Sequence, residues 1–333
     1  MGPYESAAHP VNPARMGPME CVVAVDAGGT TLKGGLVARD GTVLHQERRP
    51  TPRAEGPERV IAAIAAFTAD LARLPADPGR TPAGADRSGG GVRVVAAGVA
   101  VPGLVTPTHA VFSAAFGWRD VPAPAFAAGL DLPVALGHDV RAAGEAELAY
   151  GDGGRHVLYL PIGTGIAGAV VLDGELYGGE RGWAGQIGHV PVWPDGEPCG
   201  CGQRGCLAAY ASASAVAARC GERSAEDVVR RARAGDPAAA AVWAEAVEAL
   251  AVALATYTLV LDPEAVVIGG GLSLAGGFLL GPLRDRLAGR LAFRPPPEVR
   301  ASRLGVRAGL LGAALLAWRR LDELAGDVHD AGA

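Results

Sequence analysis

The sequence predicts an α/β protein with two similar halves. Segments with the apolar character of buried strands alternate with segments whose apolar residues recur at helical spacing. A pattern of apolar strand, glycine and threonine turn, apolar strand and Asp-Gly turn opens at Cys21 and returns at His156. The 333 residues, 49% of them hydrophobic, suffice to bury sizeable cores. We therefore expect an internally duplicated α/β fold.

The first half is predicted to open with strands and continue with a helix. Cys21 to Asp26 is a short apolar strand that ends at two glycines, and apolar segments resume before and after the turn Asp40-Gly41. Helical spacing of apolar residues predicts a helix over 58–74. Residues 76–91, dense in proline, glycine, aspartate and serine, predict a surface loop. Residues 1–20 predict a mobile, disordered tail.

The second half is predicted to alternate strands and helices until a mainly helical C-terminal third. A strand over 133–136 leads into His138-Asp139, and residues 140–150 predict a helix. The longest predicted helix covers 238–261 and ends at Asp262-Pro263, because proline cannot continue it. A buried strand over 265–268 follows, and the last periodic helix covers 310–324.

Composition excludes several classes of function. The formal charge of −5 and the pI of about 5.8 give no basic field for nucleic acid. We expect that no apolar segment reaches the roughly twenty residues of a membrane span. The N-terminus lacks the cationic start and apolar middle of a signal peptide. We therefore expect a cytoplasmic protein that binds neither nucleic acid nor membrane.

One histidine and three cysteines stand at metal-ligand spacing. His189 is followed by Cys199, Cys201 and Cys206, with glycines between the cysteines that let the chain turn tightly. This set predicts a closed Cys3His site for structural zinc. A disulfide pair and three unconnected buried thiols are the alternatives, and the missing secretory signal disfavours a disulfide framework.

Three glycine-rich turns at strand ends predict a nucleotide site. The first, Asp26-Ala27-Gly28-Gly29-Thr30-Thr31, lies between two strands, so it is not a Walker loop. Backbone N–H groups of glycines and the threonine hydroxyls can still bind phosphates. Gly163-Thr164-Gly165 has the same chemistry in the second half, and Gly269-Gly270-Gly271 offers a flat surface for a planar group. Each turn alone could be an ordinary loop.

Two charged residues complete the predicted site. Lys33 is the only lysine among 30 basic residues, and it could contact a phosphate or simply end a strand in solvent. Asp139 ends a strand and begins a helix, where it could be an N-cap. Beside two phosphate loops it is better interpreted as the carboxylate that accepts a proton during phosphoryl transfer, with Mg²⁺ and backbone donors stabilising the phosphoryl charge.

These motifs resemble the ROK family (repressors, open reading frames and sugar kinases), which belongs with hexokinase and actin in one fold superfamily. The resemblance runs from Val22 to about Leu324. The Gly-His pair with Cys-Gly-Cys-Gly-x-x-Gly-Cys is its most specific part. The other matching segments are Asp26-Ala27-Gly28-Gly29-Thr30, Val101-Pro102-Gly103, Asp139, Gly163-Thr164-Gly165, Leu261-Asp262-Pro263 and Val267-Ile268-Gly269-Gly270-Gly271.

The resemblance implies the two-domain actin-like, ribonuclease-H-like ATPase fold with an interdomain cleft. The smaller α/β domain would cover 21–136 with a returning C-terminal helix at about 308–325, and the larger domain 137–307 would contain the zinc site. Asp139 would be the general base, and the family's dimers and tetramers suggest a homodimer. ATP would contact Asp26, Gly28, Gly29, Thr30, Thr31, Lys33, Gly163, Thr164, Gly165, Gly270 and Gly271, and the acceptor would contact Gly103, His138, Asp139, Gln186 and His189.

Four positions depart from the family pattern of glucose-phosphorylating members. Asn is common before the catalytic Asp, Glu two residues before Gly-His, Glu two residues after the last zinc Cys, and Asn three residues before the sugar-loop Trp. Here these positions hold His138, Gln186, Ala208 and Ala115. Each lost partner of a hydroxyl would cost roughly 1 to 3 kcal/mol in a dry pocket. Ordinary glucose is therefore a doubtful acceptor.

From this we expect an ATP-dependent kinase for a sugar-like acceptor, more a cyclitol or modified sugar than glucose. The alternatives are a glucokinase or other hexose or N-acetylhexosamine kinase, and a non-catalytic sugar sensor of the repressor branch. Such repressors carry a helix-turn-helix domain before the first glycine loop, and only about twenty-five residues precede Asp26. We therefore expect no transcription factor.

Overall fold

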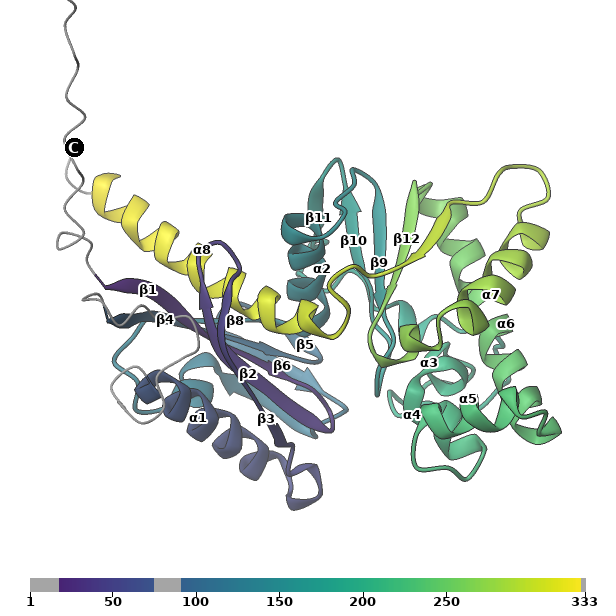
Figure 1. The fold of residues 1–333 in the computed structure, drawn as a ribbon, viewed down its shortest axis with the longest axis horizontal. Coiled ribbons are helices and arrows are strands. Elements are labelled where there is room, and N and C mark those ends of the chain that lie inside the picture. The colour runs from purple at the N-terminus through teal and green to yellow at the C-terminus, as the bar shows by residue number, and fades with distance from the viewer. Residues whose placement is uncertain (1–17, 75–90, 331–333) are drawn as a thin grey trace, which may run out of the picture.

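The computed structural model describes residues 18–74 and 91–330, and it consists of two halves built on similar sheets (Figure 1). The first sheet has the strand order β3-β2-β1-β4-β8, and the second has the order β11-β10-β9-β12-β13. In each sheet the first three strands of that half pair antiparallel, and the two remaining strands pair parallel. The predicted duplication is confirmed.

The strands of the first half begin close to their predicted positions. Its sheet comprises β1 (Met19–Ala27), β2 (Thr31–Ala38), β3 (Val43–Pro50), β4 (Val92–Val101) and β8 (Val134–His138). A small sheet of β5 (Leu104–Val105), β6 (His109–Ser113) and β7 (Trp118–Pro122) follows β4. Most of the predicted tail and of the loop predicted at 76–91 lie outside the described residues.

The second sheet comprises β9 (Val157–Pro161), β10 (Ala169–Leu172), β11 (Glu175–Tyr177), β12 (Ala265–Gly269) and β13 (Glu298–Ala301). Side chains alternate between its faces, as strand geometry requires. Leu158 and Leu160 of β9 pack into the core of the C-terminal helices, whereas Val157 and Tyr159 pack towards the other half. The α-helices are α1 (Pro57–Arg73), α2 (Asp139–Tyr150), α3 (Ala208–Ala211), α4 (Ala213–Arg219), α5 (Ala225–Arg233), α6 (Pro237–Leu261), α7 (Gly277–Arg290) and α8 (Ala308–Asp330).

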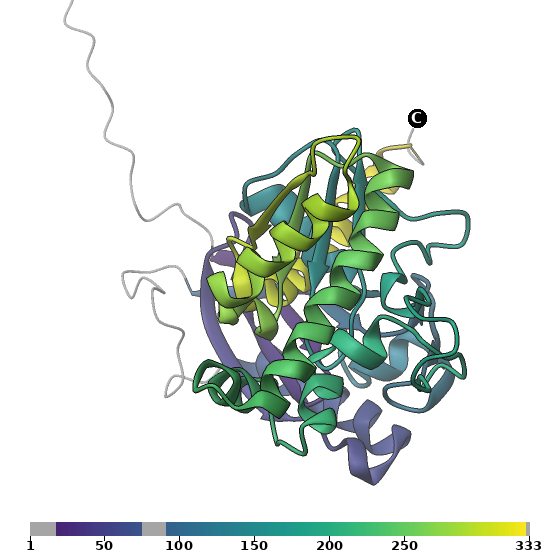
Figure 2. The ribbon, with the colours of Figure 1, turned by 90° about the vertical axis from the view of Figure 1, so that its right-hand side faces the viewer.

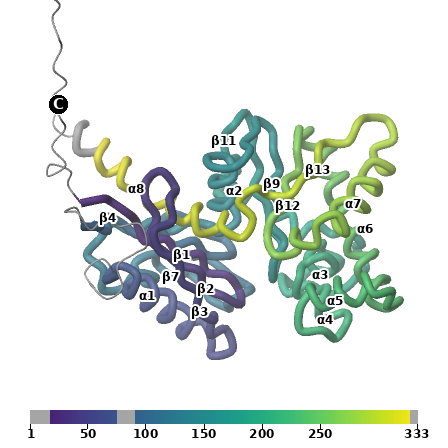
Figure 3. The backbone as a smooth tube through the Cα atoms, viewed as in Figure 1, coloured from purple at the N-terminus to yellow at the C-terminus, as the bar shows by residue number. Residues whose placement is uncertain are grey.

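Helices α2 and α8 lie between the two sheets (Figure 3). α8 packs on the first sheet and on α2, and α2 packs on the second sheet. Glycines permit this close approach, because a Cβ atom on Gly312 would lie 2.2 Å from the backbone of Ala142 and one on Gly98 would lie 1.9 Å from the carbonyl oxygen of Ala313. One apolar core therefore joins residues of both sheets.

α1 covers the outer face of the first sheet. Helices α3 to α7 cover the outer face of the second sheet, where α6 and α7 lie in front in Figure 2. α6 has 25 residues and is long and apolar enough to cross a membrane by length and composition. The estimate that no segment reaches this length was therefore wrong. α6 is a core helix of the fold, however, because Trp243, Leu250 and Leu254 are buried against α5 and α7.

Candidate active site and metal site

Asp139 lies where β8 gives way to α2, and it does not cap the helix. The cap is His138, whose Nδ1 accepts a hydrogen bond from the backbone N–H of Arg141 at 3.3 Å. Asp139 Oδ1 accepts one from the backbone N–H of Val140 at 2.7 Å, and 22% of the Asp139 side chain remains exposed. The N-cap alternative for Asp139 is wrong, and its carboxylate keeps lone pairs for another partner.

The surroundings of Asp139 favour its neutral form more than water does. Burial raises the pKa of its carboxyl to about 7, and the negative charge of Asp26 adds to the increase. The Val140 hydrogen bond and the charge of Lys33 act in the opposite direction. A carboxylate with a pKa near neutrality can accept a proton and release it again.

His138 stays neutral beside this carboxyl. Burial lowers the pKa of its imidazole to about 4, and the positive charge of Arg141 contributes further. Because Nδ1 accepts the Arg141 N–H, we assign the proton of the neutral ring to Nε2.

Asp26 is held at the end of β1. Its side chain is 9% exposed, and its Oδ2 binds Lys33 Nζ at 3.0 Å. On another side it meets the start of α8, where a Cβ atom on Gly309 would lie 2.2 Å from Oδ2. Sequence reasoning grouped Asp26 and Lys33 around ATP, whereas the structure pairs them with each other.

The first two glycine turns meet. Gly28 N–H donates to Thr31 O at 3.1 Å, and the Thr51 hydroxyl donates to Gly28 O at 2.7 Å, which braces the β1–β2 turn. In the second turn the Ser214 hydroxyl donates to Thr164 O at 2.5 Å. A Cβ atom on Gly29 would lie 3.3 Å from Cγ2 of Thr164. The two turns therefore lie in contact, from opposite halves of the chain.

The third turn adjoins the second through Ile162. Ile162 N–H donates to Gly269 O at 3.0 Å, and Leu272 N–H donates to Ile162 O at 3.1 Å. Gly270 has a φ of 73°, and a Cβ atom there would lie 2.4 Å from Ile162 O, so both conformation and space favour glycine. The turns at 163–165 and 269–271 therefore form one continuous backbone surface.

The predicted acceptor residues lie on separate segments. Gly103 follows β4 with a φ of 113°, and Gln186 precedes the 3-10 helix η5 (Ile187–His189). Gly188 packs against Ile166, which places η5 beside the second turn. Within residues 18–74 and 91–330, no hydrogen bond joins Gly103 or Gln186 to Asp139. Of the departing positions, Ala115 lies between β6 and β7, and Ala208 begins α3.

Arg141 is a further candidate site residue, which the sequence motifs do not indicate. Its Nη1 donates to Gly182 O at 2.8 Å, and a Cβ atom on Gly178 would lie 3.1 Å from Nη2. The segment 178–185 therefore wraps around the guanidinium before it reaches Gln186. Only the chain position of Arg141, two residues after Asp139, could have indicated this contact.

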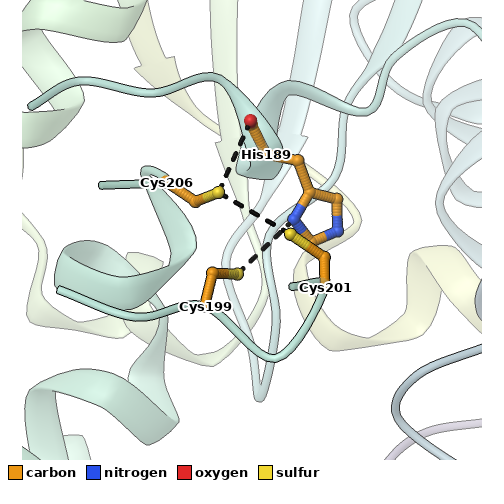
Figure 4. Close-up of side chains that lie close together, drawn as sticks. All are labelled: His189, Cys199, Cys201 and Cys206. Carbon is orange, nitrogen blue, oxygen red and sulfur yellow. Dashed lines mark hydrogen bonds between the residues drawn. The ribbon is translucent and has the colours of Figure 1, made fainter. Parts of the chain in front are cut away.

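The predicted metal ligands converge at one point (Figure 4). The ligand atoms of His189, Cys199, Cys201 and Cys206 all lie within 4.8 Å of one another. Cys201 Sγ lies 3.8 Å from Cys206 Sγ, and Cys199 Sγ lies 3.7 Å from His189 Nδ1. A tetrahedral zinc site with Zn–S bonds of about 2.3 Å requires sulfur atoms about 3.8 Å apart. The donor set and its spacing therefore fit zinc, and all five cysteines are free thiols.

The cluster is tied to the segment that carries Gln186. Val192 N–H donates to Gly205 O at 2.8 Å, and Leu207 N–H donates to Val190 O at 2.9 Å. These bonds hold the cysteine loop against the strand-like segment that follows η5. A metal bound here would thus fix η5 through its last residue, His189.

Comparison with known proteins agrees with this architecture. The family model described as "ROK family" matches residues 22–320. The chain is 35% identical to a glucokinase of Thermotoga maritima, over 90% of this chain and 98% of the relative. It is 32% identical to an N-acetylmannosamine kinase of Yersinia pseudotuberculosis, over 90% and 98% of the two chains.

A solved structure shows the same fold. The ROK family glucokinase of Streptomyces griseus, in complex with glucose and AMPPNP, superposes with a TM-score of 0.78 at 29% identity and covers 90% of this chain and 99% of that one. The duplicated sheets, the glycine turns and the Cys3His cluster lie within the matched region. The chain belongs to the ROK family.

Proposed function

We propose that this protein transfers the γ-phosphoryl group of ATP to a hydroxyl of a hexose or an N-acetylhexosamine. The observation that carries the proposal is the position of Asp139 at the start of α2, where its partly exposed carboxylate accepts a hydrogen bond from the Val140 N–H. The charges of Asp26 and Lys33, which form an ion pair, both act on this carboxyl. The two glycine turns in contact at Gly29 and Thr164 supply backbone donors from both halves of the fold.

In the proposed reaction Asp139 takes the proton of the acceptor hydroxyl. The hydroxyl oxygen forms a bond to the γ-phosphorus while the bond from that phosphorus to the β-γ bridging oxygen breaks, and ADP leaves. The exposed fifth of the Asp139 side chain gives the acceptor access. Mg²⁺ would accompany the ATP phosphates and neutralise their charge.

ATP would be held by the three glycine turns. Gly28, Gly29 and Thr30 would bind phosphates from one half, and Gly163, Thr164 and Gly165 from the other. Gly270 and Gly271 would lie near the adenosine. Support comes from the contact between the first two turns and from the shared backbone of the second and third.

The relatives favour a hexose or N-acetylhexosamine over the cyclitol that the sequence alone suggested. They are a glucokinase and an N-acetylmannosamine kinase by name. The neutral His138 would donate through Nε2, Gln186 can accept or donate, and Ala115 and Ala208 leave space. These four positions argue for an acceptor that carries a substituent larger than a hydroxyl.

The test is a coupled assay of ADP release with ATP-Mg²⁺ over glucose, mannose, fructose, N-acetylated hexosamines and cyclitols. We expect one hexose or N-acetylhexosamine to be the best acceptor, and Asp139→Asn to lose about 100-fold to 10,000-fold in kcat. Asp131→Asn, an exposed carboxylate outside the site, is the matched control. Turnover of cyclitols alone would contradict the acceptor class. Binding of sugar without ADP release would favour a sensor.

We also propose that the Cys3His cluster binds one structural zinc ion per chain. Thiolates and imidazole nitrogen at tetrahedral spacing support this choice of metal. Bound zinc would fix the segment from Gln186 to His189 next to the acceptor. Metal analysis of the purified chain tests the assignment, and a zinc content near zero would refute it.

A cytoplasmic location and a homodimer complete the proposal. Free thiols suit a reducing compartment. Leu259, Val260 and Phe293 are 54%, 74% and 80% exposed, and burial of such side chains favours association. Light scattering of the purified protein distinguishes a dimer from a monomer.

A further inference from the structure

The only lysine of the chain lies directly opposite an active-site aspartate. Lys33 and Asp26 are paired residues in the antiparallel β1–β2 ladder, and their side chains form an ion pair at 3.0 Å. The Lys33 side chain is 26% exposed and that of Asp26 is 9% exposed. The pair is therefore partly shielded from water, where Coulomb interactions are stronger than at the surface.

The same aspartate faces two other elements. The start of α8 approaches its carboxylate at Gly309, where no side chain fits, and the charge of Asp26 acts on Asp139 at the start of α2. Tyr159 of β9 also feels the charge of Asp26, and His138 and Arg141 are titratable groups next to Asp139. Lys33 is the only cation paired with Asp26 among the described residues.

We propose that Lys33 is a positioning residue that acts through Asp26: across the β1–β2 pair it fixes this carboxylate and neutralises the negative charge that Asp26 would otherwise direct at Asp139. The inference rests on the proposed function of Asp139 as the base. It differs from a direct phosphate contact, in which the Lys33 ammonium group would bind ATP instead of neutralising Asp26.

The consequence concerns the proton on Asp139. Two carboxylates close together resist simultaneous ionisation, so an uncompensated Asp26 would make Asp139 hold its proton to higher pH. The charge of Lys33 opposes this effect, and it favours the form of Asp139 that can accept a proton. Lysine removal would thus impair catalysis most at low pH.

The experiment measures kcat/KM for the best acceptor against pH in Lys33→Met, Lys33→Arg and the full-length wild type. In such a profile the acid limb is the fall of kcat/KM at low pH. For Lys33→Met we expect this limb to move to higher pH by about one unit. The kcat/KM of the variant should then be about fivefold to tenfold below that of the wild type at pH 6.5 and nearly equal to it at pH 9. Lys33→Arg keeps the charge and should keep the limb within about 0.3 unit. The KM for ATP should change less than about twofold.

Arg48 provides the matched control, because it lies opposite Lys33 on β3 and is exposed. Arg48→Met should leave the acid limb in place. A large rise in the KM for ATP with an unmoved limb would overturn the proposal in favour of a phosphate contact. An unmoved limb with unchanged KM, or an equal shift in Arg48→Met, would also overturn it. Failure of the base assignment is separate, since it would appear as full activity of Asp139→Asn.

Discussion

At the residue scale, two neighbouring side chains at the start of α2 have different tasks. His138 satisfies a backbone N–H of the first turn, and Asp139 retains free lone pairs. Burial affects their pKa values in opposite directions, lowering that of His138 to about 4 and raising that of Asp139 to about 7. One environment therefore yields a neutral hydrogen-bond donor beside a carboxylate that titrates near neutrality.

The cap function of His138 can be separated from its predicted acceptor contact. His138→Ala removes the cap and should lower the free energy of unfolding by about 1 kcal/mol, whereas His138→Asn should retain it, because an Asn oxygen caps well. Both should alter the KM for the acceptor. Chemical denaturation and acceptor kinetics of the two variants check this. Equal losses of stability in both would show that the Nδ1 bond does not cap α2.

At the element scale, short segments join the parts of the site. Arg141 on α2 binds the segment 178–185, which continues through Gln186 to the proposed zinc ligand His189. The backbone of the segment 178–185 surrounds the Arg141 guanidinium, so we expect this segment and α2 to move together. Arg141 therefore contributes to the position of Gln186 relative to Asp139, together with the contacts of Gly185 and Gly188 with the segment 166–168.

Arg141→Met should therefore impair acceptor binding more than ATP binding. We expect the KM for the acceptor to rise about threefold to tenfold, as for loss of one charged hydrogen bond, with the KM for ATP changed less than about twofold. Arg284→Met is the control, since Arg284 Nε likewise donates to a backbone carbonyl, that of Val299, at 2.8 Å. Steady-state kinetics with each substrate varied would measure both. Equal effects of the two variants would exclude a positioning role for Arg141.

The sequence predicts elements of this site better than the contacts between them. The glycine turns, Asp139 and the Cys3His ligands are recognisable because their chemistry depends on residue type and local spacing. The pairing of Lys33 with Asp26 depends on the register of the β1–β2 hairpin. The hydrogen bond from Arg141 to Gly182 O joins residues that are 41 positions apart in the sequence. Local patterns do not encode such contacts, and the expectation that no apolar segment is long enough to span a membrane did not hold for α6.

At the scale of the whole molecule, the duplicated sheets bring the glycine turns of the two halves into contact. The first glycine turn follows β1, and the second follows β9, the equivalent strand of the other sheet. α2 and α8 fill the space between the sheets, so the start of α8 meets Asp26 while the start of α2 carries Asp139. The domain boundaries at 136 and 308 remain a prediction, because the α2–α8 core is common to both halves.

This arrangement makes the charge on Asp139 the central feature of the account. The most direct test is kcat/KM for the best acceptor from pH 5.5 to 9 in the wild type and in Asp139→Asn. Because the base must be ionised, the wild-type rate should fall about tenfold per pH unit below its pKa near 7, and the residual rate of Asp139→Asn should be at least about 100-fold lower and lack this limb. A wild-type rate independent of pH over this range, or wild-type activity of Asp139→Asn, would contradict the account.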